Sequence, residues 1–394
     1  MNIQNSYRHT IYASYLGYIT QAIVNNLAPL LFLIFRAEYG FSLRQITLLT
    51  TINFAVQLLV DLISAKWIDK IGYRISVVMA HVFAAVGLVG MAVFPSVFSD
   101  AYVGMLFAVI LYAIGGGIIE VLISPIVEAC PSDHKASAMS LLHSFYCWGT
   151  VAVVFLSTCF LQIAGKEHWR WLCFLWALLP LANGFYFSKV PIYILVEENE
   201  GMSIRELVKN KMFWLFFILM IAAGASEQGM SQWASAFAES GLHLSKVWGD
   251  IAGPCFFSLL MGLSRAYYGK HGERMDLLKY ILASAVLCVL SYGVVVFAPY
   301  PLLSLLGCGM CGLSVGILWP GVFSLASKEL PKGGTAMFAL LALSGDVGCS
   351  GGPTLVGSVA NVFGDDLKMG LLSATVFPMI LILCACILKK RKKS

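Results

Sequence analysis

Four acidic residues stand inside long apolar stretches of the sequence: Asp61, Glu120, Glu227 and Asp346. Where such a stretch crosses a bilayer, an ionised acid near its centre costs on the order of 2.5–3.5 kcal/mol, so these acids usually face the protein interior and carry function. The sequence places no Lys or Arg at the centre of these stretches to pair with the acids. We therefore predict exchange of H⁺ or Na⁺ at Glu120, Glu227 and Asp346, and a packing or gating role for Asp61.

Two of these acids have glycine-rich surroundings that leave two interpretations open. Glu120 follows Gly115, Gly116 and Gly117, and either couples to a cation or makes a structural hydrogen bond that fixes helix packing. Asp346 lies in a glycine-rich run ending at Pro353. A loosened helix there could coordinate an ion through freed carbonyls, or small residues could simply pack closely.

Neutral polar and aromatic side chains gather in the same apolar stretches. Amide, hydroxyl and indole groups can hydrogen-bond the hydroxyls of a sugar or polyol, and an aromatic ring can support its apolar face. Any single one is more often a helix-packing residue. The predicted solute-binding set, which also includes Glu227, is Gln21, Asn25, Asn26, Asn53, Gln57, Tyr146, Trp148, Gln228, Gln232 and Trp319. His143 is a candidate proton relay, with a hydrogen-bonded structural role as the alternative.

The elements that must position these residues are membrane-spanning helices. The chain is 59% hydrophobic and 12% charged, whereas soluble domains are roughly 45–50% apolar and about 25% charged. A spanning helix needs about 20 apolar residues. We therefore predict an all-α integral membrane protein with twelve spans, near 10–35, 45–66, 75–97, 102–127, 138–163, 169–189, 212–236, 247–269, 277–298, 301–326, 335–362 and 368–388.

The basic residues predict the orientation of these spans. Most of the 26 Lys and Arg residues fall on the side of the membrane that holds both ends of the chain, and the positive-inside rule makes that side cytoplasmic. The only long inner loop lies in the middle of the chain. We predict a six-helix bundle over 1–190, a cytoplasmic linker over 191–211, a second six-helix bundle over 212–388 and a basic tail over 389–394. Anchoring at anionic headgroups is the favoured role of this tail, with partner binding as the alternative.

Four short matches, in the same order along the chain, indicate a duplicated six-helix unit. They pair residues 37–43 with 238–244, Lys-x-Gly-x-Arg at 70–74 with 270–274, Gly and Pro eight apart at 117 and 125 with 312 and 320, and Ala-Met at 138 with 336. All offsets lie between 195 and 201. By this repeat, Glu227 corresponds to Asn26.

Other classes of protein have little support in the sequence. It contains no GxxxxGK[ST] or HExxH motif, which argues against P-loop ATP-driven transport and against a zinc-dependent membrane hydrolase. The eleven Cys lie mostly in apolar stretches without metal-ligand spacing. We expect no enzyme activity, no cofactor, no metal and no nucleic-acid partner.

The segment Ala65-Lys66-Trp67-Ile68-Asp69-Lys70-Ile71-Gly72-Tyr73-Arg74 resembles the loop signature G-x-L-x-D-R-x-G-R-R of the major facilitator superfamily, with Ala in place of the first Gly. The resemblance implies two pseudosymmetric six-helix bundles, a central cavity lined by spans 1, 2, 5 and 7, and a protein that usually works as a monomer. It also implies that this loop latches the two halves on the cytoplasmic side. Gating is therefore expected to involve Asp69, Lys70 and Arg74, with Asp61 close by.

More narrowly, the run Gly115-Gly116-Gly117-Ile118-Ile119-Glu120 followed by Ser124-Pro125 resembles the span 4 pattern of the fucose-permease-like sugar:proton symporters. Asn25 and Asn26 also resemble residues of these relatives. The intramembrane acid that the relatives carry shortly afterwards is absent, and Pro29 stands near that place. The resemblance implies cation coupling at Glu120.

Together these features predict a secondary active transporter of the cell inner membrane that moves a small polar solute, such as a sugar, coupled to H⁺ or Na⁺, with uptake the favoured direction. Export of an amphipathic drug or metabolite is the alternative, because 15 Met and 25 Phe residues could supply an adaptable lining. A receptor or scaffold that does not transport is the alternative from another class. The sequence leaves open the solute, the cation and the direction of transport.

Overall fold

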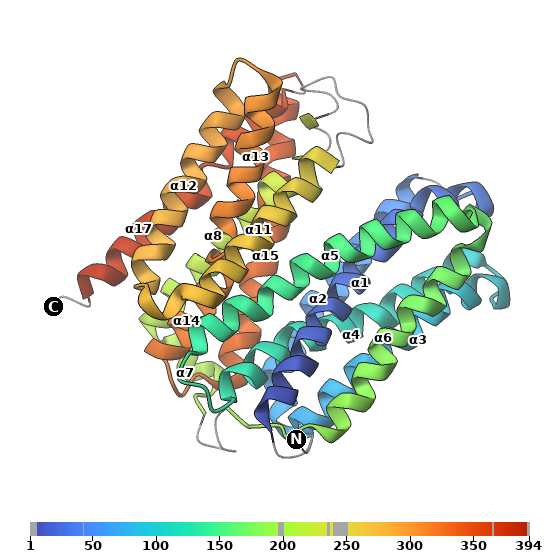
Figure 1. The fold of residues 1–394 in the computed structure, drawn as a ribbon, viewed down its shortest axis with the longest axis horizontal. Helices are drawn as coiled ribbons and strands as arrows, with labels where there is room; N and C mark the ends of the chain where they lie inside the picture. Colours follow the sequence, from blue (N-terminus) through green and yellow to red (C-terminus); the bar gives the residue numbers. More distant parts are fainter. Residues whose placement is uncertain are drawn as a thin grey trace. The chain divides into compact units, whose positions relative to one another are not determined.

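The computed structural model describes residues 6–41, 43–195, 201–234, 237–238, 251–364 and 366–391. All regular elements within these ranges are helices (Figure 1): α1 (Tyr7–Tyr39), α2 (Leu43–Ile71), α3 (Tyr73–Val97), α4 (Ala101–Ala129), α5 (Lys135–Ala164), η2 (Lys166–His168), α6 (Trp169–Lys189), α7 (Ile204–Lys209), α8 (Lys211–Ser231), η4 (Ile251–Cys255), α11 (Phe256–His271), η5 (Gly272–Arg274), α12 (Leu277–Phe297), α13 (Pro301–Val315), α14 (Leu318–Glu329), α15 (Gly334–Val362), α16 (Leu367–Ser373) and α17 (Val376–Arg391).

The twelve predicted spans are helical over nearly all of their described residues, with turns at 232–233, 316–317 and 374–375, which confirms the all-α prediction. Among the described residues, nine helices are long and apolar enough to cross a membrane by length and composition. Span 10 is made of α13 and α14, and span 12 of α16 and α17. The end of predicted span 7 at 235–236, the start of span 8 at 247–250 and the repeat segment 239–244 lie outside the described residues.

The chain separates into two compact units. Unit 1 comprises residues 1–132, 148–201 and 334–339, and unit 2 comprises residues 133–147, 202–333 and 340–394. Helix α5 therefore belongs to unit 2 as far as Cys147 and to unit 1 from Trp148 onward. These units group residues by contact, and the sequential halves 1–190 and 212–388 remain a prediction.

In unit 1, α3 packs against both α4 and α6. The contact between α3 and α4 is close because small residues face each other. A Cβ placed on Gly115 of α4 would lie 2.5 Å from the carbonyl oxygen of Ala80, and one on Gly87 of α3 would lie 2.8 Å from the carbonyl oxygen of Ala108. The interface thus brings the two backbones together and holds the glycine-rich part of α4 in place.

In unit 2, the glycines of α15 pack against α8 in the same manner. A Cβ on Gly348 would lie 3.0 Å from the backbone nitrogen of Ala225, and one on Gly352 would lie 2.5 Å from the carbonyl oxygen of Ala225. Helix α15 is continuous from Gly334 to Val362, with Pro353 inside it. Close packing of small residues is thus present around Asp346 and the helix is continuous there, while cation coupling at Asp346 stays a prediction.

Side-chain caps fix several helix starts. Asp100, Asn210, Asp276 and Asp366 each accept a hydrogen bond from a backbone N–H in the first turn of α4, α8, α12 and α16. These bonds satisfy donors that have no partner within the helix. At the opposite end of α1, Gly40 adopts φ 69°, a left-handed conformation that suits glycine, and its N–H donates to the carbonyl oxygen of Arg36.

Candidate functional site

A ladder of side-chain amides joins α1 and α2 in unit 1. Gln21 and Asn25 are one turn apart on α1, and Asn53 and Gln57 are one turn apart on α2. Gln57 Nε2 donates to Asn25 Oδ1 at 2.9 Å, and Gln21 Nε2 donates to Gln57 Oε1 at 2.9 Å. Asn53 Nδ2 lies 3.3 Å from Asn25 Oδ1. The structure therefore brings four of the predicted solute-binding residues into one hydrogen-bonded group.

Glu120 of α4 joins this ladder through Gln21, whose Nε2 lies 3.0 Å from Glu120 Oε2. The approach of α4 depends on the two glycines before it. A Cβ on Gly116 would lie 3.0 Å from Gln21 Oε1, and one on Gly117 would lie 3.2 Å from Gln57 Cα. Larger residues at these two positions would separate the carboxylate from the amides.

The ladder changes from buried to half-buried along its length. Gln21, Asn53 and Gln57 are buried, whereas Asn25 and Glu120 are half-buried. Gln21 Oε1 and Asn53 Oδ1 are buried acceptors that have no hydrogen-bond partner among the described residues. Such acceptors are costly unless a ligand or water completes them. The free oxygen atoms of the ladder can thus accept hydrogen bonds from the hydroxyls of a solute, or coordinate a cation.

Asn26 lies next to the ladder without joining it. Its Nδ2 donates to the carbonyl oxygen of Ala22 at 2.8 Å and lies 3.3 Å from Thr150 Oγ1 on α5. Asn26 is half-buried. Its predicted solute contact stays a prediction.

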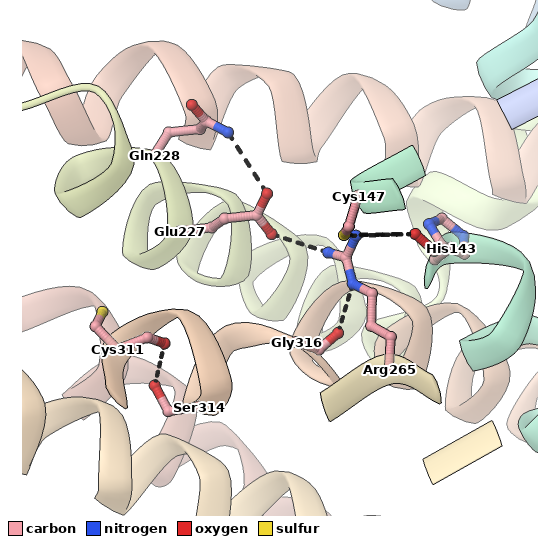
Figure 2. A network of polar contacts seen from close by, with 8 residues as sticks. All are labelled: His143, Cys147, Glu227, Gln228, Arg265, Cys311, Ser314 and Gly316. Atoms are coloured by element: carbon pink, nitrogen blue, oxygen red, sulfur yellow. Dashed lines mark hydrogen bonds and ion pairs between the residues drawn. The ribbon is translucent and has the colours of Figure 1, made fainter. Parts of the chain in front are cut away.

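A second polar group lies in unit 2, where Arg265 of α11 meets Glu227 of α8 (Figure 2). Arg265 Nη2 lies 3.1 Å from Glu227 Oε2, and both residues are buried, with 3% and 8% of their surfaces exposed. The expectation that no basic residue would pair with the intramembrane acids is therefore wrong for Glu227. Arg265 stands a few residues before the end of the predicted span 8, and its long side chain reaches Glu227 near the C-terminal end of α8.

The backbone of the α13–α14 turn supplies another partner of Arg265. Arg265 Nε donates to the carbonyl oxygen of Gly316 at 2.8 Å. Pro320 follows four residues later in α14 and has no N–H, so the helical hydrogen bond to Gly316 cannot form. The guanidinium takes the place of the missing donor.

Helix α5 provides the remaining partners that Figure 2 shows. Arg265 Nη1 lies 3.2 Å from the carbonyl oxygen of His143 and 3.2 Å from Cys147 Sγ. Ser140 Oγ also donates to the carbonyl oxygen of Arg265 at 2.8 Å. Residues 140, 143 and 147 follow helical spacing, so one face of α5 holds Arg265. His143 acts through its backbone here, which the sequence did not suggest.

The amides of α8 extend this group beyond Glu227. Gln228 Nε2 lies 3.5 Å from Glu227 Oε1, and Gln232 Nε2 donates to Gln228 Oε1 at 3.1 Å. Gln228 is half-buried and Gln232 is exposed. Three of the predicted solute-binding residues therefore form a chain that runs from the surface of unit 2 to the buried ion pair.

Three predicted aromatic contacts lie elsewhere. Trp319 is buried against Gly345 of α15, and its ring makes an edge contact with Phe323, with centroids 6.2 Å apart. Tyr146 and Trp148 are half-buried and belong to different units. The predicted solute contacts of these three side chains stay predictions. Asp346 is half-buried on α15.

The loop residues predicted to act in gating have separate surroundings. Asp61 is buried, and the side chain of Asp69 lies outside the described residues. The ammonium of Lys70 lies 5.1 Å from the ring centroid of Trp67. Arg74 Nη1 donates to the carbonyl oxygens of Phe187 and Ser188 at 3.0 and 2.9 Å, where a cation compensates the C-terminus of α6. A latch function was predicted from the sequence; the bond from Arg74 to α6 was not.

Comparison with known proteins adds to these observations. Residues 14–353 match the family model of the Major Facilitator Superfamily.

Similar solved structures include the E. coli fucose:proton symporter FucP, with 14% identity, a TM-score of 0.82 and coverage of 97% of this chain and 99% of that chain. The proton:xylose symporter XylE has 11% identity, a TM-score of 0.84 and coverage of 97% and 95%. The human organic anion transporter MFSD10 (TETRAN) has 14% identity, a TM-score of 0.77 and coverage of 97% and 100%. At these identities the likeness concerns the fold. No curated protein sequence matches this chain.

Proposed function

Because this chain belongs to the major facilitator superfamily, and is thus a multi-pass membrane transporter, we propose that it carries a small polar solute, a sugar or a similar molecule, by alternating access coupled to H⁺ or Na⁺. The fold of known sugar:proton symporters is consistent with this proposal. The proposed location is the cell inner membrane, with both termini in the cytoplasm and the protein acting as a monomer. The halves 1–190 and 212–388 would move about the linker, with Asp61, Asp69, Lys70 and Arg74 in the gate.

The observation that carries the proposal is the contact between Glu120 and the amide ladder. Amide groups both donate and accept, so they can satisfy the hydroxyl groups of a sugar in several orientations. The unsatisfied acceptors of Gln21 and Asn53 provide places for solute hydroxyls or for a cation. A hard cation such as Na⁺ would be held by amide and carboxylate oxygens. These properties support a polar solute over an amphipathic one.

The ladder also offers a way for a proton at Glu120 to affect the amides. Ionised Glu120 accepts a hydrogen bond from Gln21 Nε2. Once protonated, Glu120 can instead donate to Gln21 Oε1, if the amide turns over. That rotation withdraws Nε2 from Gln57 and changes the acceptors available along the ladder. Proton uptake and solute binding would then influence each other.

The test is transport by purified protein in proteoliposomes, with radiolabelled pentoses, hexoses and polyols, under a pH gradient or a Na⁺ gradient. For the Glu120→Gln variant we expect gradient-driven uptake to fall by more than about tenfold, an amount equivalent to 1.4 kcal/mol or more. Exchange of solute without a gradient should persist, because it does not need the titrating carboxyl. The matched control is Glu167→Gln, which removes an exposed acid outside the spans.

Gradient-driven uptake that survives in Glu120→Gln would overturn the assignment of coupling to this residue. Transport of hydrophobic cations alone, without any sugar or polyol, would replace the proposal with export. Binding of a solute without flux into the vesicles would indicate a receptor.

A further inference from the structure

The ion pair in unit 2 combines one charge that is fixed with one that can be removed. The guanidinium of Arg265 remains protonated in proteins, whereas a carboxyl such as Glu227 can take up a proton. Arg265 is also held from other directions by the carbonyl oxygens of Gly316 and His143 and by Cys147 Sγ. Protonation of Glu227 would therefore leave the guanidinium in place and remove the carboxylate charge beside it.

A buried charge without compensation is strongly destabilising. When Glu227 is neutral, Arg265 thus favours the arrival of another anion. A carboxylate fits this role well because its two oxygens match the planar fork of a guanidinium. A phosphate monoester, by contrast, carries more charge than the single charge that Glu227 gives up.

The glutamate side of the pair is the more accessible one. The side chain of Glu227 is 11% exposed and that of Arg265 is 4% exposed. The chain of amides from exposed Gln232 through Gln228 ends at Glu227 Oε1, and its last contact, at 3.5 Å, is long. This chain gives a polar path along which a proton or an anionic group can reach the pair, and Figure 2 shows its inner end, from Gln228 to Glu227.

We propose that Arg265 binds the carboxylate of an acidic solute, such as a sugar acid or a hydroxy acid, and that Glu227 takes up one proton with it. The solute carboxylate replaces the Glu227 carboxylate as the anion beside Arg265. The O–H bond that forms on Glu227 replaces one broken in a hydronium ion of the surrounding water, and the solute keeps all its bonds, so the charge within the group is the same before and after. The inference rests on the proposed function and specifies its solute as a carboxylate.

The other groups that the structure describes near Glu227 carry no permanent positive charge that could bind a solute carboxylate. His143 and Cys147 of α5 contact Arg265, Tyr292 of α12 donates to the carbonyl oxygen of Ser226, and Cys349 of α15 packs against Gly224. Of these neighbours, only Arg265 is a permanent charge. Glu227 is the acid that the structure joins to it.

The test measures thermal stability of the detergent-solubilised protein against D-galacturonate, D-gluconate and L-lactate between pH 5.5 and 8, with D-galactose as the uncharged match of galacturonate. For the wild type we expect at least one acid to bind, with an apparent Kd that falls by up to about tenfold for each unit that the pH is lowered, as uptake of one proton requires. Glu227→Gln mimics the protonated carboxyl. It should keep the binding and lose most of this pH dependence.

Arg265→Gln should abolish acid binding, and because that variant leaves a buried carboxylate it can fail to fold. The double variant Arg265→Gln with Glu227→Gln removes both charges and preserves neutrality, so it serves as the folded control that must not bind the acids. Acid binding by the double variant, unchanged pH dependence in Glu227→Gln, or no acid binding to the wild type at any pH would each overturn the proposal.

Failure of the carboxylate inference can be distinguished from failure of the proposed function. Uptake of a neutral sugar that requires Glu120, together with no binding of the acids, would remove the carboxylate inference and leave the transporter proposal standing. Proton movement into vesicles on addition of the acids, measured with an internal pH dye and lost in Arg265→Gln with Glu227→Gln, would support the inference by a readout that is independent of stability.

Discussion

Gln21 Nε2 donates to two acceptors at once, Gln57 Oε1 at 2.9 Å and Glu120 Oε2 at 3.0 Å. One amide nitrogen therefore links the carboxyl on α4 to the ladder between α1 and α2. Both hydrogens of that nitrogen are used. This amide group thus connects the protonation of Glu120 to the ladder.

Removing Gln57 should break the ladder on both sides. Gln57→Leu keeps the approximate volume but leaves Gln21 and Asn25 without their shared partner, and we expect a loss of about 1–3 kcal/mol of unfolding free energy. Solute uptake should fall as well. Denaturant unfolding in detergent and uptake assays check this, with Asn361→Leu, an exposed amide on α15, as the control. Equal stability of the two variants would show that the ladder does not contribute to the fold.

The charges of Arg265 and Glu227 should be coupled in stability. Each single change, Arg265→Gln or Glu227→Gln, strands a buried charge and should cost about 3–5 kcal/mol. The double variant should lose much less than the sum, because no charge remains unpaired. A double-mutant cycle from unfolding midpoints measures the coupling. Losses that simply add would mean that the two residues do not stabilise each other.

The close contact between α3 and α4 predicts a large difference between two glycine substitutions. Gly87→Ala should destabilise the protein by about 1–3 kcal/mol, because the new methyl would collide with the backbone of α4. Gly293→Ala is the matched control, since a Cβ on Gly293 of α12 has no neighbour within 4 Å among the described residues. Better helix propensity should make that variant neutral or up to about 1 kcal/mol more stable. The comparison of thermal midpoints decides between the two expectations.

The short helix α7 begins with a reciprocal cap between Ser203 and Glu206. Hydrogen bonds from the backbone and hydroxyl of Ser203 lower the pKa of the Glu206 carboxyl below its usual value. A lowered pKa means that the cap stabilises α7 fully above the unfolded-state pKa and is lost as the pH falls through the folded-state value, in the region below pH 4.5. Hydrogen exchange of residues 204–209 should accelerate there relative to α8. Glu206→Gln should remove that pH dependence, and an unchanged dependence would refute the role of the cap.

The sequence predicted the twelve helical spans because hydrophobic stretches of membrane length carry a strong signal. It also placed Asn53 and Gln57 one turn apart, and their joint contact with α1 follows from that spacing. The particular bonds to Gln21 and Asn25 could not be predicted, because they depend on how α1 and α2 are rotated and placed along each other.

The pairing of Arg265 with Glu227 was missed for a physical reason. Basic residues near the ends of spans usually extend toward water, and Arg265 was assigned to that group. Its surroundings in the sequence, with apolar residues before it and Ala266-Tyr267-Tyr268 after it, were a usable signal of burial. Whether a single arginine near a helix end is buried depends on its tertiary partners, which one sequence does not reveal.

The two glycine–proline pairs of the sequence repeat, Gly117 with Pro125 and Gly312 with Pro320, have the same spacing but different backbone structures. Helix α4 continues through Pro125, whereas α13 ends at Val315 and α14 begins at Leu318, before Pro320. At the offset of 200 that relates Lys70 to Lys270, Arg265 corresponds to Ala65, which has no hydrogen-bond donor in its side chain. The two halves therefore share the Gly–Pro spacing, but within the described residues only the second half has an arginine that donates to the carbonyl oxygen left free by the proline.

Pro320 has a role in unit 2 although none of its own atoms bonds to Arg265. By omitting one amide hydrogen, it keeps the Gly316 oxygen open to a donor from another helix. Replacing this proline would place a competing N–H four residues from Gly316, and the guanidinium would have to share its acceptor or lose it. The position of the Arg265 guanidinium thus depends on the absence of an N–H at residue 320. A related sequence that retains the arginine without this proline would need a different acceptor for the guanidinium.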